Sequence, residues 1–61
     1  MAKYRVDVSV DYRTVDTDLY TTVVDADNEA DALYMAENEA YDEYDVLDVM
    51  ITKIEKVEDG D

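Results

Sequence analysis

Carboxylates are the most abundant reactive groups in this sequence: 18 Asp and Glu side chains stand against five Lys and Arg, with no His and no Cys. Two neighbouring carboxylates can act as general acid and base when a cleft shifts their pKa values apart. Asp16 with Asp18, and Asp42 with Glu43, are spaced for such pairs. A chain of 61 residues has no material for a deep cleft, however, so we expect binding and not enzymatic activity.

A further set of carboxylates, Asp25, Asp27 and Glu29, is spaced like the opening of a calcium-binding loop. The sixth position of such a loop is a glycine and the twelfth is a bidentate glutamate. Counted from Asp25, these positions hold Ala30 and Ala36. With no His or Cys to supply other ligands, the sequence predicts neither a metal site nor a cofactor.

Two strands that form a hairpin are expected to carry part of this charge. Residues 3–13 alternate strictly between apolar and polar side chains, which predicts a strand with one buried face. Residues 19–25 are rich in β-branched and aromatic side chains and predict a second strand. The loop over residues 14–18 contains no Gly or Asn, so a connection longer than a two-residue primed turn is expected.

A helix is predicted over residues 28–44, with Asp27 as its N-cap and Glu29 in the first turn, where the helix dipole favours negative charge. Helical spacing defines one stripe that should pack on the sheet. That stripe is Ala30, Leu33, Ala36, Ala40 and Tyr44. The opposite face is polar and carries Asp31, Met35, Asn38, Glu39 and Asp42.

A third strand is predicted over residues 47–57. Its inward residues are Leu47, Val49 and Ile51. Ile54 has the other parity, so a bulge near Thr52 or Lys53 is needed to return it to the core.

The order strand, strand, helix, strand predicts an α+β fold of ββαβ type, a three-stranded antiparallel sheet with one helix packed on one face. Residues 1–61 should form one small domain, with residues 58–61 as a frayed tail. No apolar run has the length of a signal peptide or a membrane span, so we expect a cytoplasmic protein. Small domains without disulfides often pair with a second copy, which makes a homodimer a candidate assembly.

The charges are divided unequally along the chain. Residues 14–52 contain twelve carboxylates and no basic residue, a net charge of −12; the remaining six carboxylates and five basic residues sum to −1. Helices of soluble proteins usually mix charge signs to gain i,i+4 pairs, and the predicted helix has none. Such a surface repels nucleic acid and favours a basic partner. Carboxylates one helical turn apart, about 6 Å, could replace backbone phosphates in that partner's groove.

The residues expected to contact this partner lie on the predicted helix, in the loop after it and in the hairpin loop. Tyrosines at the edge of the acidic helix face are included because aromatic side chains often anchor interfaces. The contact set is Asp16, Asp18, Asp31, Tyr34, Glu39, Tyr41, Asp42, Glu43 and Asp45.

The alternating strand of residues 4–12, the Ala- and Asp-rich segment 23–33 and the segment 51–57 resemble the small strand-strand-helix-strand proteins of phages and mobile elements. Acidic members of that group without His or Cys are similar to DNA-mimic inhibitors: anti-CRISPR and anti-restriction proteins, and inhibitors of uracil-DNA glycosylase or of bacterial nucleoid proteins. The resemblance implies a host partner that is itself a basic nucleic-acid-binding protein, with no direct contact to nucleic acid and no membrane.

Two other interpretations of the acid excess remain open. An Asp-rich, Lys-poor surface is also typical of a structural or interaction module from a halophilic organism. A further alternative is a subunit that regulates an enzyme by docking its open sheet face.

Overall fold

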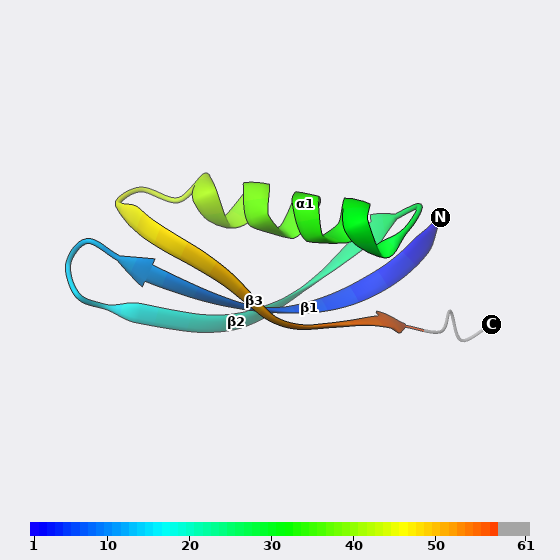
Figure 1. Cartoon of the computed structure of the whole chain (residues 1–61), viewed down its shortest axis with the longest axis horizontal. Helices are drawn as coiled ribbons and strands as arrows, with labels where there is room; N and C mark the ends of the chain where they lie inside the picture. Colours follow the sequence, from blue (N-terminus) through cyan, green and yellow to red (C-terminus); the bar gives the residue numbers. More distant parts are fainter. Residues whose placement is uncertain (58–61) are drawn as a thin grey trace.

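Alternating valines build the centre of the sheet. The computed structural model describes residues 1–57. In it, β1 (Ala2–Tyr12) buries Tyr4, Val6, Val8 and Val10 on one face. It pairs antiparallel with β2 (Thr17–Ala26) on one side and with β3 (Val46–Val57) on the other, in the order β2-β1-β3. The predicted α+β fold of ββαβ order is thus confirmed (Figure 1).

A single helix, α1 (Glu29–Tyr41), covers the buried face of this sheet (Figure 1). Its N-cap is Asn28, not Asp27 as predicted: the Asn28 side chain has extended backbone angles and accepts the Asp31 N–H at 2.9 Å. The predicted start was therefore one position early. At the other end the helix stops at Tyr41, which leaves Tyr44 in the loop and 90% exposed.

The helix packs through three alanines, Ala32, Ala36 and Ala40, each of which is fully buried. They recur every four residues and allow the helix to approach the valines closely. The predicted stripe was wrong at Ala30, which is exposed because it lies about 120° around the helix from Ala36. Leu33, which the sequence placed within the stripe, is only half-buried and lies at its edge.

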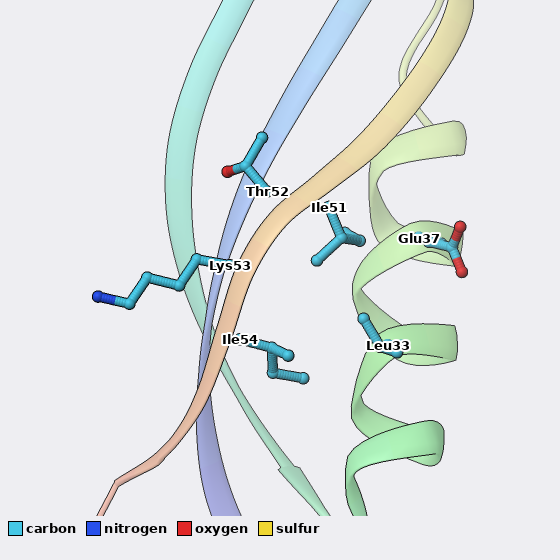
Figure 2. Close-up of a pocket in the computed structure, with 6 residues that line it drawn as sticks. All are labelled: Leu33, Glu37, Ile51, Thr52, Lys53 and Ile54. Atoms are coloured by element: carbon cyan, nitrogen blue, oxygen red, sulfur yellow. The ribbon is translucent and has the colours of Figure 1, made fainter.

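Two bulges interrupt β3. Asp7 pairs with Lys53 and Val8 with Ile51, so Thr52 is the extra residue, as predicted. Figure 2 shows the result: Ile51 and Ile54 point toward the helix while Thr52 and Lys53 point away from it.

The second bulge was not predicted. Asp11 pairs with Asp48 and Tyr12 with Val46, which makes Leu47 the extra residue. Leu47 is therefore 62% exposed instead of inward, and Val46 packs against the core in its place.

The strands are longer than the helix. Thirteen helical residues span about 20 Å, whereas strands of 10 to 12 residues span about 33 to 40 Å. The molecule measures 42 × 15 × 14 Å, and the β1–β2 hairpin projects beyond the C-terminal end of α1 (Figure 1). Within the described residues no helix has the length and apolar character that crossing a membrane requires. The fraying expected for residues 58–61 lies outside the described residues.

The hairpin turn carries an unfavourable backbone conformation. The Tyr12 carbonyl accepts the Val15 N–H at 3.1 Å, and the Tyr12 N–H donates to the Asp16 carbonyl at 2.8 Å. This longer connection is of the expected kind. It places Val15 at φ 72°, a left-handed conformation that β-branched residues rarely adopt.

Replacing Val15 by glycine should therefore stabilise the fold. Left-handed geometry costs a non-glycine residue about 1–3 kcal/mol, and the larger entropy of unfolded glycine offsets part of this gain. We expect Val15→Gly to raise the free energy of unfolding by about 1 kcal/mol in urea titrations. Val23→Gly, at an exposed position inside β2, should lower it. If both variants lowered the free energy of unfolding by similar amounts, the left-handed conformation of Val15 would be contradicted.

Candidate acidic interface

Acidic residues collect where the hairpin projects beyond the helix. We call this region the hairpin end: the β1–β2 loop, the adjoining ends of the three strands, the last turn of α1 and the α1–β3 loop. The Arg13 N–H donates to the Asp45 carbonyl at 3.0 Å and so joins the two loops. Apart from Asp31 and Tyr34, the predicted contact residues lie here, namely Asp16, Asp18, Glu39, Tyr41, Asp42, Glu43 and Asp45. All of these are exposed except Asp45, which is half-buried.

The two remaining predicted contact residues lie elsewhere on the helix. Asp31 is in the first turn, where its backbone N–H is capped by Asn28, and Tyr34 follows on the exposed face. The structure thus does not bring Asp31 together with the hairpin-end carboxylates.

Two tyrosines show that carboxylates from separate elements share one neighbourhood. Partial burial raises the pKa of Tyr12, and the nearby charges of Asp18 and Glu43 raise it further. Burial also raises the pKa of Tyr20, with Glu39 as its strongest acidic neighbour, followed by Glu43 and Asp18. β2, the last helical turn and the following loop therefore direct negative charge at the same pair of rings.

Threonine hydroxyls hold several of the carboxylates. Thr17 donates to Asp11 at 2.9 Å and Thr21 to Asp7 at 2.7 Å, both between neighbouring strands. Two longer contacts follow the same pattern, from Thr14 to Asp16 at 3.4 Å and from Thr22 to Glu39 at 3.5 Å. A threonine hydroxyl is neutral, so these bonds hold the carboxylates in place without adding a positive charge beside them.

The cations are concentrated at the opposite end of the sheet. Two ion pairs form among residues 1–57, Lys3 with Asp25 at 3.1 Å and Arg5 with Glu55 at 2.6 Å. Asp7 and Asp11, which also lie on the open face of the sheet, accept threonine hydroxyls and take part in neither ion pair. Of the five basic residues, only Arg13 belongs to the hairpin end.

The hairpin end also places like charges directly opposite each other. Asp11 on β1 faces Asp48 on β3 on the open side of the sheet, an arrangement that destabilises a strand pair. Neither residue was among the predicted contacts. The pairing could be found only with the register of β3 against β1, which runs without interruption from the Val8 and Ile51 pair to Asp11 and Asp48.

Apolar side chains accompany these acids. Val15, which is 94% exposed, and Leu47 line one shallow hollow of about 250 Å³ together with Tyr12 and Asp16. The larger hollow, about 610 Å³, lies between α1 and β3, where Leu33, Ile51 and Ile54 form apolar walls (Figure 2). Among the described residues, no cluster of three or more acids is arranged to hold a metal ion.

Comparison with protein-family models, with curated proteins and with solved structures gives no match to this chain.

The neighbourhood of Tyr12 and Tyr20 can be tested by alkaline titration of the tyrosine rings. Because both pKa values are raised above 10.0 in the folded protein, stability should be retained below pH 10 and lost as the pH rises through the folded values. Glu43→Gln should lower the pKa of both rings. Asp31→Asn, which removes an equal charge at the far end of the helix, should shift neither. NMR titration of the ring protons measures these shifts, and equal effects of the two variants would disprove the shared neighbourhood.

Proposed function

We propose that this protein is a non-enzymatic acidic inhibitor that occupies the nucleic-acid-binding surface of a basic host protein. The supporting observation is that three hairpin-end carboxylates, Asp11, Asp16 and Glu39, accept threonine hydroxyls, while no basic side chain forms an ion pair with a hairpin-end acid among residues 1–57. A phage counter-defence factor of the anti-CRISPR type, acting in the host cytoplasm, is the setting that agrees with the resemblance of the sequence.

The hairpin-end acids destabilise the free protein. Asp11 opposite Asp48 weakens the strand pair, and Asp18, Glu39 and Glu43 lie around Tyr20 with no ion pair to any of them among residues 1–57. In a basic groove these acids would gain attractive interactions, because each carboxylate would then face a lysine or arginine. Carboxylates that are already oriented in the free protein lose less conformational entropy when they bind a partner.

The shape of the molecule suits a groove that normally holds nucleic acid. Its length of 42 Å corresponds to about a dozen base pairs, and its cross-section is 15 × 14 Å. Within the hairpin end, the β1–β2 hairpin projects beyond the helix, so it can enter such a groove first.

Competition with DNA is the direct test. The protein would be immobilised, a bacterial lysate applied, and bound material eluted either with duplex DNA or with polyglutamate of the same total charge. We expect a nucleic-acid-binding protein that DNA elutes more effectively, with affinity that falls steeply as salt rises. A retained protein that binds DNA and this chain simultaneously, without mutual weakening, would refute mimicry.

Charge reversal then locates the surface. Glu39→Lys combined with Glu43→Lys should reduce affinity for the retained protein at least a hundredfold, because two attractive contacts become repulsive. The matched control, Asp27→Lys with Asp31→Lys, changes the net charge equally but at the other end of the helix. It should weaken binding much less, and equal losses would mean that net charge alone governs binding.

A halophilic module is the alternative that the number of acids favours. Under our proposal the protein is folded at physiological ionic strength, and added salt raises its melting temperature moderately by screening like charges. This gain should be smaller in Asp48→Asn, which removes the pair with Asp11. A chain that stays unfolded until molar salt is present would instead support the halophilic alternative.

A further inference from the structure

The two edges of the sheet differ in how they are protected. β3 carries the two bulges, at Leu47 and Thr52, and two lysines, Lys53 and Lys56. Bulges and lysines are the devices with which proteins prevent strands from pairing at an open edge. β2 forms the other edge, and its ten residues pair with β1 without a register shift and include no Lys, Arg or Pro. Only one edge is therefore open to another strand.

The open edge presents a defined set of backbone groups. At the turn, the Tyr12 N–H donates to the Asp16 carbonyl, so these two residues form a hydrogen-bonded pair. In an antiparallel ladder every second pair is hydrogen-bonded, and the next such pair is Val10 with Asp18. The even-numbered residues of β2 thus bond to β1, and the odd-numbered residues direct their N–H and C=O groups outward. At the centre of the edge these are Leu19, Thr21 and Val23.

The side chains that border this edge differ between the two faces. On the helix face, Asp18 belongs to β2 itself, and Glu39 lies 3.5 Å from the Thr22 hydroxyl. Glu43 adds a third negative charge beside Tyr20. On the open face, Leu19 and Val23 are exposed and apolar, at 73% and 54%. An added strand would therefore meet acids on one face and aliphatic groups on the other.

We propose that the β2 edge binds an extended segment of the basic partner, whose residues alternate between basic side chains toward the helix face and apolar side chains toward the open face. The choice of a basic partner rests on the proposed function. Backbone hydrogen bonds of the new strand supply affinity, and the alternation supplies specificity. Contact would extend from the hairpin end along β2.

A second copy of this chain fits the edge less well. Each copy carries a net charge of −13, and an antiparallel β2–β2 pair would bring two sets of Asp18, Glu39 and Glu43 to one interface. Such a contact would gain hydrogen bonds but would concentrate like charges.

Synthetic peptides test the proposal without any nucleic acid. The probe is a peptide of about nine residues, a usual length for a strand, in which arginine and valine alternate. Its controls are a peptide of equal composition with the arginines and valines in separate blocks, and the alternating peptide methylated on its valine nitrogens. We expect the alternating peptide to bind at least tenfold more tightly than either, since the controls lose the side-chain pattern or the backbone bonds. NMR should show slowed amide exchange at Leu19, Thr21 and Val23 and unchanged exchange in β3.

Variants of the edge complete the test. Thr21→Pro removes one outward N–H and should reduce binding about tenfold, whereas Thr21→Val loses the hydroxyl bond to Asp7 but keeps that N–H and should bind normally. Should the proline variant fail to fold, Leu19→Lys with Val23→Lys tests the same edge through its apolar side chains and should also weaken binding.

Three results would overturn the proposal: equal binding of the block peptide, exchange protection outside β2, or a peptide-free dimer that Thr21→Pro dissociates, which would assign the edge to a second copy. If the peptide does not bind but DNA still competes with the retained protein, only the proposal of strand addition is refuted. If the peptide binds but DNA does not compete, the proposal of nucleic-acid mimicry is refuted instead.

Discussion

Close contact between the alanines of α1 and the valines of β1 is the interaction on which the rest of this molecule depends. Its largest fully buried side chains are Val6, Val8 and Val10, and the helix meets the sheet mainly through alanine. Small side chains bury little area each, so the contact must be tight and continuous to offset chain entropy. The position of α1 on the sheet is therefore fixed within narrow limits, and this position determines where its surface residues lie.

The mismatch in length between helix and strands decides where the charge can gather. A helix that covered the full sheet would have placed its C-terminal acids over apolar side chains. Because α1 stops at Tyr41, the acids of its last turn meet those of the hairpin, and the basic residues near the chain's N-terminus lie too far away to neutralise them. Charge separation along the long axis thus follows from the geometry of the core.

Much of the fold could be predicted because the strands show a clear alternation of apolar and polar residues. Alternation in residues 3–13 identified the buried face of β1, and the parity of Ile54 identified the bulge at Thr52. The predicted helix stripe was right at Ala36 and Ala40, but it included Ala30 in place of Ala32 because Leu33 shifted its centre to one side. Alanines give only a weak hydrophobic signal in a sequence, although their small size is what lets the helix pack closely on the sheet.

The candidate site was less predictable than the fold. The sequence identified the acidic segment, and the structure placed most of the predicted contact residues at one end. The sequence could not reveal Asp48 opposite Asp11, since that pair depends on the register of β3 against β1, which alternation alone does not fix. Nor could it reveal that threonines would be the partners of Asp7 and Asp11, because cross-strand neighbours require a register as well as a pattern.

The position of β1 has a consequence for how the chain is made. It precedes the other strands in the sequence but is the central strand of the sheet, and Lys3 pairs with Val57, more than fifty residues later. Pairing over such sequence separations is slow, so the emerging β1–β2 hairpin must wait with two unpaired edges and a bare valine face. Residues 2–26 carry five acids and three basic residues, a net charge of −2, so repulsion between nascent chains grows only as the nine acids of residues 27–48 are added. The acids of the helix and its following loop would thus keep partly made chains apart before β3 closes the sheet.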